Sequence, residues 1–106
     1  MARILMRVPK AAKRGEVFEI RALISHRMEP GYRRTRTGKR IPQDIIHHFV
    51  ATYNGETIFE ARLYPAIAAN PFISFFTEAV ESGTIELAWT GDKNFKASRS
   101  AQIEVT

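Results

Sequence analysis

Apolar and polar residues alternate with a period of two along most of the chain. Within residues 16–26, positions 18, 20, 22 and 24 are apolar, whereas positions 19, 21 and 25 are polar or charged. Such alternation is typical of a strand with one buried and one solvated face, and no segment predicts a helix longer than about one turn. The predicted strands cover residues 3–8, 16–26, 45–53, 56–64, 72–79, 84–90 and 95–105.

Turn signals separate these strands at regular intervals. Asn54-Gly55 lies directly between two strand patterns and predicts a hairpin, because both residues tolerate the positive φ of a type I′ turn. Residues 91–94 predict the turn of the last hairpin. About seven short strands and a single tryptophan, Trp89, indicate an all-β, immunoglobulin-like antiparallel sandwich that forms one domain over residues 1–106. A small β-barrel is the alternative.

The composition excludes several kinds of chemistry. The chain has 106 residues and no cysteine, so it has no disulfide, no thiolate nucleophile and no sulfur ligand for zinc or an iron-sulfur cluster. Its acidic residues are isolated, and it contains no Gly-x-Ser-x-Gly motif and no phosphate-binding glycine-rich loop. We therefore expect a protein that is not an enzyme and needs no cofactor or metal.

Positive charge is concentrated in the first half of the chain. The net charge is +5, with +8 in residues 1–44 and −3 in residues 45–106. The densest part is a polar segment at about residues 27–43, which has too few apolar groups to build a core and should project as a loop or loose hairpin. We expect it to bind an acidic protein surface, with nucleic-acid binding or a merely solvated loop as alternatives. The candidate partner-binding residues here are Arg33, Arg34, Arg36, Lys39 and Arg40.

A second candidate surface lies in the predicted strand at residues 72–79. Phe72 and Phe76 are accompanied by Ile73 and Phe75, so this strand is apolar on both faces. Such a strand is either central, with both faces covered by its own domain, or covered on one face by a partner. Asn70-Pro71 should form an exposed turn before it, and we add both residues to the candidate partner-binding set.

Three histidines are candidates for metal binding or for structural roles. His47 and His48 are adjacent in a predicted strand and point to opposite faces, so they cannot ligate one ion together. His26 could pair with one of them across the sheet. No carboxylate stands at ligand spacing, and we therefore expect structural or surface imidazoles.

Several blocks of residues, in their order and spacing, resemble the SoxZ family over most of the chain. A single block such as Tyr53-Asn54-Gly55 would occur in many hairpins, but the series is far more specific. The blocks are His26-x-Met28-Glu29-x-Gly31-x-Arg33, Gly38-x-x-Ile41-Pro42, Ile46-x-x-Phe49, Tyr53-Asn54-Gly55-Glu56, Phe59-x-Ala61, Pro65-Ala66-x-Ala68-Ala69-Asn70-Pro71, Ser82-Gly83 and Trp89-Thr90.

The resemblance implies a non-catalytic subunit of the SoxYZ carrier complex. In that family the SoxY partner carries sulfur intermediates of thiosulfate oxidation on a C-terminal cysteine, and separate enzymes process them. The first ten residues contain no hydrophobic run of the kind a signal peptide needs, and no segment is long and apolar enough to span a membrane. The resemblance therefore implies a periplasmic protein that is exported together with its signal-bearing partner. The isolated chain could form homo-oligomers. The alternative function is a basic adaptor that binds nucleic acid or an acidic protein through residues 32–42.

Overall fold

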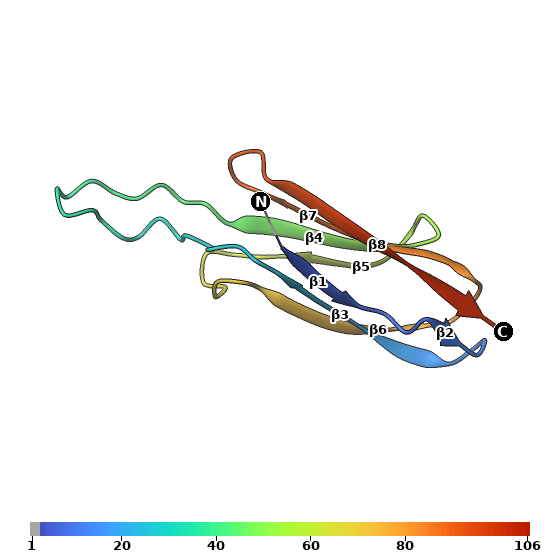
Figure 1. Ribbon diagram of the computed structural model, residues 1–106. Helices are drawn as coiled ribbons and strands as arrows, with labels where there is room; N and C mark the ends of the chain where they lie inside the picture. Colours follow the sequence, from blue (N-terminus) through green and yellow to red (C-terminus); the bar gives the residue numbers. More distant parts are fainter. Residues whose placement is uncertain (1–2) are drawn as a thin grey trace.

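The computed structural model describes residues 3–106, which form an antiparallel β-sandwich of two sheets (Figure 1). Eight strands are present where the sequence predicted about seven. The additional strand is only two residues long and lies between the predicted strands at residues 3–8 and 16–26. It forms because Ala11 and Ala12 run parallel to Glu104 and Val105 at the end of the chain. The strands are β1 (Ile4–Arg7), β2 (Ala11–Ala12), β3 (Val17–Ile24), β4 (Ile46–Tyr53), β5 (Glu56–Arg62), β6 (Phe72–Glu78), β7 (Gly83–Gly91) and β8 (Lys96–Val105).

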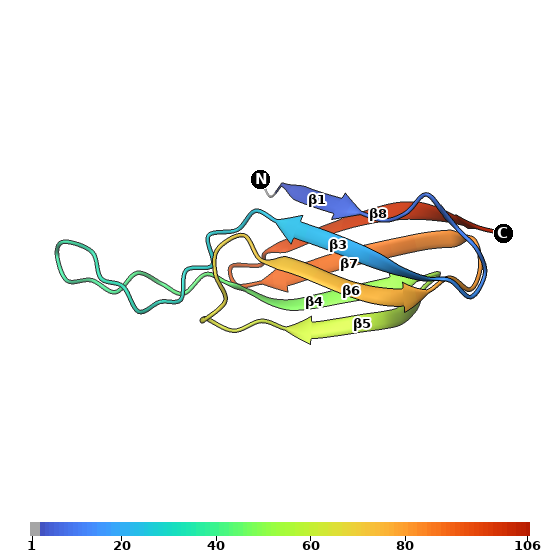
Figure 2. The same cartoon turned by 90° about the horizontal axis from the view of Figure 1, so that it is seen from below.

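The two sheets have different sizes. The smaller sheet has the strand order β1-β3-β6, and the larger has the order β2-β8-β7-β4-β5. Figure 2 shows the small sheet in front of the large one, with β5 and β6 as edge strands on the same side of the sandwich. This arrangement confirms the predicted all-β sandwich. Residues 3–106 form no helix that is long and apolar enough to cross a membrane.

The core lies between the two sheets, where the inward side chains of alternating positions meet. Trp89 and Phe49 are almost fully buried, and their rings lie 5.1 Å apart between centroids. Phe59 of β5 and Phe75 of β6 stack at 4.6 Å and close the core between the two edge strands. Phe18, Ile20, Ala22 and Ile24, which the period of two predicted to share one buried face, are all buried in this core.

The predicted hairpin between β4 and β5 is confirmed. Asn54 and Gly55 both have positive φ values, 50° and 83°. The Asn54 side chain also accepts a hydrogen bond from the backbone N–H of Thr84 at 2.9 Å. The turn therefore ties the β4–β5 hairpin to the start of β7.

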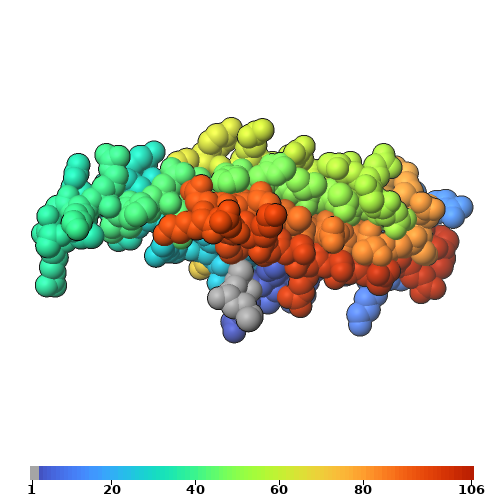
Figure 3. Space-filling view, turned by 90° about the horizontal axis from the view of Figure 1, so that it is seen from above, coloured from blue at the N-terminus to red at the C-terminus, as the bar shows by residue number. Residues whose placement is uncertain are grey.

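Residues 27–43 project from one end of the sandwich as a long hairpin, which we call the arm (Figures 1 and 3). The molecule measures 60 × 20 × 19 Å and has a radius of gyration of 16.3 Å. A compact domain of this length would have a radius of gyration of about 13 Å. The arm accounts for this elongation, and the prediction of a projecting segment is confirmed.

Candidate functional site

The base of the arm is fixed by paired backbone and side-chain contacts. Glu29 and Asp44 exchange two backbone hydrogen bonds, each 2.8 Å long. The Glu29 side chain is only 2% exposed, and its carboxylate accepts hydrogen bonds from the guanidinium of Arg33. These hydrogen bonds hold the pKa of Glu29 below its ordinary value and raise the pKa of Arg33. Arg33 is thus a structural cation of the arm as well as a candidate contact residue.

A glycine allows the two chains of the arm to come close together. Gly31 has a φ of +85°, and a Cβ there would lie 3.1 Å from Cβ of Gln43 and 3.2 Å from its backbone nitrogen. Any other residue would meet both an unfavourable left-handed conformation and a close contact. Two independent constraints, the backbone conformation and the close contact, therefore require glycine at position 31.

The tip of the arm is a tight, hydrogen-bonded turn. The N–H of Thr35 donates to the carbonyl of Lys39 at 2.7 Å, and the N–H of Gly38 donates to the carbonyl of Thr35 at 3.0 Å. The guanidinium of Arg34 donates to the carbonyl of Gly38 at 2.9 Å. Within the described residues, the basic side chains of the tip form no ion pair. The tip therefore presents a cluster of unpaired cations: Arg34, Arg36, Lys39 and Arg40.

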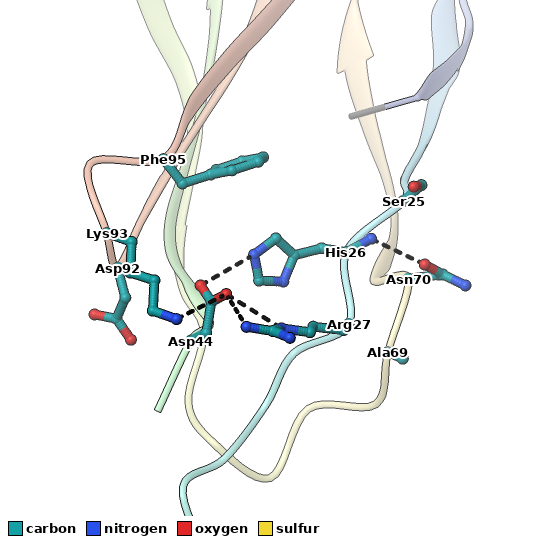
Figure 4. Close-up of a pocket in the computed structure, with 9 residues that line it drawn as sticks. All are labelled: Ser25, His26, Arg27, Asp44, Ala69, Asn70, Asp92, Lys93 and Phe95. Carbon is teal, nitrogen blue, oxygen red and sulfur yellow. Dashed lines mark hydrogen bonds and ion pairs between the residues drawn. The ribbon is translucent and has the colours of Figure 1, made fainter. Parts of the chain in front are cut away.

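A polar hollow at the foot of the arm is organised around Asp44 (Figure 4). Its carboxylate lies 2.9 Å from the guanidinium of Arg27 and 3.9 Å from Nζ of Lys93. His26 contributes Nε2 at 3.7 Å from the other carboxylate oxygen. One carboxylate thus connects the end of β3, the arm and the β7–β8 turn, which fixes the direction in which the arm projects.

His26 has a structural role in this hollow. Its Nδ1 accepts a hydrogen bond from the N–H of Met28 at 2.9 Å, and its ring packs edge-on against Phe95 with centroids 5.0 Å apart. Burial lowers the pKa of His26, and the charge of nearby Asp44 opposes this effect. The ring is therefore mostly neutral at pH 7 and supports the backbone at Met28, which has a φ of 50°.

The alternative that His26 pairs with another histidine across one sheet is wrong. His26 follows β3 of the small sheet, whereas His47 and His48 belong to β4 of the large sheet. His48 instead contacts Glu60 on the neighbouring β5 at 2.5 Å. Among residues 3–106 there is no group of three or more His, Cys, Asp or Glu side chains that could hold a metal ion.

The outward face of the small sheet carries a row of apolar residues at one end. Leu5, Leu23 and Phe72 are opposite one another on β1, β3 and β6 and form a row across the sheet. Leu5 and Phe72 are 59% and 58% exposed, and Phe76, two positions further along β6, is 66% exposed. Phe75 lies on the inner face and is buried. β6 is therefore covered on its inner face and uncovered on its aromatic outer face, and it also forms one edge of the small sheet.

Asn70 and Pro71 position this strand. Asn70 has a φ of 54°, accepts the N–H of His26 through its side chain at 2.9 Å and donates its own N–H to the carbonyl of His26 at 2.7 Å. Pro71 is buried. Its ring therefore cannot be a direct contact for a partner, in contrast to the exposed turn that the sequence suggested. The pair instead connects the small sheet to the foot of the arm.

Sequence reasoning missed the hollow at the foot of the arm. Asp44, Asp92, Lys93 and Phe95 were not candidates, because they come from an arm end and from a hairpin turn that are about 50 residues apart in the chain. The carboxylate of Asp92 accepts hydrogen bonds from the Gln43 side chain at 2.9 Å and from the N–H of Ile45 at 3.2 Å. The hydrogen bond from Gln43 is the main cause that lowers the pKa of Asp92.

Solved structures with the same architecture define the fold class of the protein. A superoxide reductase (neelaredoxin) from Ignicoccus hospitalis matches with a TM-score of 0.75 and 14% identity, over 97% of this chain and 80% of that chain. The sulfur carrier protein SoxY from Chlorobium limicola f thiosulfatophilum matches with a TM-score of 0.65 and 11% identity, over 97% of this chain and 78% of that one. At such identities the likeness shows a shared immunoglobulin-like sandwich fold. No curated protein matches the chain significantly by sequence.

The family follows from the sequence. The family described as sulphur oxidation protein SoxZ matches residues 6–102, which is nearly the whole chain. The chain therefore belongs to the SoxZ family, and it is a subunit of a Sox sulfur-oxidation system. This confirms the resemblance found in the sequence blocks.

Proposed function

We propose that this chain is the non-catalytic subunit of a SoxYZ carrier complex. In this complex it pairs stably with a SoxY-like subunit that carries the reactive cysteine. The observation that supports the proposal best is the uncovered apolar row of Leu5, Leu23 and Phe72, extended by Phe76, on a chain of the SoxZ family. Aromatic and aliphatic anchors of this kind typically form the centre of a protein interface, because their burial drives association.

The arm supplies a second contact surface in this proposal. Arg34, Arg36, Lys39 and Arg40 belong to the outer part of the arm, which projects beyond the sandwich from a fixed base. Unpaired arginines suit acidic protein surfaces, since each guanidinium can hold a carboxylate with two hydrogen bonds. In the complex they orient the carrier toward the enzymes that process the partner's cysteine, and the arm takes part in no chemistry itself.

The proposal places the protein in the periplasm, exported in complex with its partner. An absence of cysteine fits this role, because a second thiol could capture the sulfur cargo as a dead-end disulfide. The division of labour is then simple. The partner supplies the thiol, and this chain supplies the docking surfaces.

The experiment is co-expression of this chain with the SoxY of the same organism, followed by size-exclusion chromatography with mass detection. The proposal expects a stable 1:1 complex that survives dilution. Separate elution of the two chains at micromolar concentration would contradict it.

Nucleic-acid binding through the arm is the second candidate function. The four unpaired cations at the tip favour it electrostatically. Tyr32, 76% exposed, is the one aromatic residue in the sequence of the arm, whereas single-strand binders interleave several. Steep salt-dependent binding to a single-stranded oligonucleotide, lost when Arg34, Arg36 and Arg40 are replaced by Gln, would support this alternative.

A further inference from the structure

We propose that the free edge of β6 pairs with β6 of a second copy of this chain. The two strands run antiparallel with Ser74 on the two-fold axis, and the two small sheets join into one continuous six-stranded sheet. The proposal concerns the chain without its partner and does not depend on the proposed function.

The backbone of β6 has a full set of unpaired groups on its outer edge. At one end of the strand, the carbonyl of Pro71 accepts a hydrogen bond from the N–H of Ile24. At the other end, the N–H of Ala79 donates to the carbonyl of Glu16, and the carbonyl of Ala79 accepts from the N–H of Gly15. The backbone N–H and C=O groups of the odd-numbered residues of β6 therefore point toward β3. This follows because the direction of these groups alternates along a strand and the β3–β6 register has no shift. The N–H and C=O groups of residues 72, 74, 76 and 78 consequently point to the free edge, where no other strand of residues 3–106 lies.

The side chains of the same residues make this edge self-complementary. With Ser74 opposite Ser74 of the second copy, Phe72 lies opposite Phe76 and Phe76 opposite Phe72. The dimer thus gains two cross-strand aromatic pairs on one face. A shift of one pairing step would place Phe72 opposite Glu78 and Phe76 opposite Ser74, and would lose both aromatic pairs. The side-chain pattern therefore selects one register.

The charges on this face permit the pairing. Arg21, opposite Ser74 on β3, forms an ion pair with Glu19 at 2.9 Å, and Glu19 also accepts the hydroxyl of Ser74 at 2.5 Å. In the proposed register the two copies of Arg21 are separated by both β6 strands, so like charges are about 14 Å apart. The row of Leu5, Leu23 and Phe72 then continues across the interface to Phe76 of the second copy.

β6 also lacks the features that normally protect an edge strand. It has seven residues, with no lysine, no proline and no bulge. The neighbouring edge strand β5 differs, because it carries Glu56, Glu60 and Arg62 and pairs with β4 through a register shift at Ala51 and Thr52. Of these two edge strands, which lie on the same side of the sandwich, β6 is the one suited to pairing. An interface of one strand pair is small, so we expect a dissociation constant on the order of 10 μM.

Single-cysteine crosslinking tests this arrangement, because the natural chain has no cysteine. Ser74→Cys places two thiols directly opposite each other, with Cα atoms about 5.5 Å apart, within disulfide range. Glu78→Cys is the matched control on the same strand and face. Its thiols would be about 27 Å apart, since residue 78 lies opposite residue 70. Under mild oxidation at about 50 μM protein, chosen to exceed the expected dissociation constant, the proposal expects a covalent dimer with Ser74→Cys and monomer with Glu78→Cys.

Sedimentation velocity supplies the second measurement. The unmodified chain is expected to show a reversible monomer–dimer equilibrium, and Ser74→Lys to remain monomeric, because it places like charges on the two-fold axis. Ser100→Lys, on β8 of the other sheet, should dimerise as the natural chain does. Equal crosslinking of the two cysteine variants, or a dimer that survives Ser74→Lys, would overturn the proposal. Because no partner protein is present, either result leaves the proposed function untouched.

Discussion

Arg27 and Asp44 form an ion pair across the foot of the arm, with Nη2 of the arginine 2.9 Å from Oδ2 of the carboxylate. The same carboxylate also attracts His26 and Lys93. Asp44 is therefore the residue through which the arm is held in one direction relative to the sandwich. The arm therefore has a defined position relative to the sandwich, even though its outer half buries almost no apolar surface.

Replacing this carboxylate should loosen the arm. Asp44→Asn leaves three neighbouring cationic or polar groups without their charged partner, and we expect a loss of about 1–2 kcal/mol in unfolding free energy. Hydrogen exchange of the amides of residues 27–44 should accelerate, with the strands of the large sheet unchanged. Glu104→Gln, an exposed carboxylate on β8, is the control and should change neither quantity. Equal exchange in the arm of Asp44→Asn and the natural chain would refute this role.

Two glycines of the arm provide a matched pair of substitutions. Gly31 and Gly38 both have a φ of +85°, but only Gly31 has atoms of Gln43 where a Cβ would lie. Gly38→Ala should cost about 1 kcal/mol for backbone strain alone, and Gly31→Ala should cost more. Thermal or urea unfolding measures both. A Gly31→Ala variant that is no less stable than Gly38→Ala would show that the contact with Gln43 relaxes without cost.

Protonation of His26 should destabilise the foot of the arm. Because burial lowers its pKa in the folded state, the unfolded chain binds the proton more readily. Stability is therefore lost as the pH falls from about 6.5 through the lower folded value. The melting temperature should decline over this range, and the decline should be smaller in His26→Gln. His48→Gln serves as the control, and an identical pH profile in both variants would rule out His26 as the group responsible.

Glu29 should produce a second, more acidic loss of stability. Its pKa is lowered in the folded state by the hydrogen bonds from Arg33, so its contribution is present above the unfolded value and is lost as the pH falls through the folded one. Hydrogen exchange in the arm should therefore rise below about pH 4. In Glu29→Gln this acid-dependent rise should be absent, and the arm should already exchange faster at pH 7. Retention of the acid-dependent step in Glu29→Gln would assign it to another carboxylate.

The cations of the arm tip should control encounter with the processing enzymes. Arg34, Arg36 and Arg40 can be replaced by Gln together, leaving Arg33 in place because it supports Glu29. We expect association of the carrier complex with these enzymes to slow by about tenfold at low salt and to lose most of its salt dependence. The control replaces three exposed cations at the opposite end of the molecule by Gln: Lys10, Lys13 and Arg14. It removes the same charge and should change the association rate little. Equal slowing by both triple variants would indicate a general charge effect.

The strands, the core and the projecting arm could be predicted because they follow from local patterns. Alternation with a period of two identified the inward face of β3, and Asn54-Gly55 identified the hairpin, since both depend on neighbouring residues. The foot of the arm could not be predicted in this way. His26, Asp44 and Lys93 meet only after the two sheets have packed, and a single sequence carries no signal for that meeting.

The aromatic edge was predictable only in part. The sequence showed that residues 72–76 are apolar on both faces, but it could not decide whether the second face is covered. That outcome depends on the layers of the fold: the described residues form two sheets, so no third sheet covers the outward face of β6, where Phe72 and Phe76 are exposed. Likewise, a run of basic residues does not reveal that Arg33 is bound to a buried carboxylate while its neighbours are unpaired.

The central claim is that this SoxZ-family chain binds a SoxY-like subunit through the outward face of its small sheet. Isothermal titration of the chain with the SoxY of the same organism tests it most directly, using Phe72→Ser combined with Phe76→Ser. Tyr64→Ser combined with Val80→Ser is the matched control, because these residues are similarly exposed but lie outside the strands of the small sheet. The account predicts that the first pair weakens binding by at least about 100-fold, as loss of interface anchors does, and that the control pair changes it little. Tight binding that the Phe72 and Phe76 substitutions leave unchanged would contradict the account.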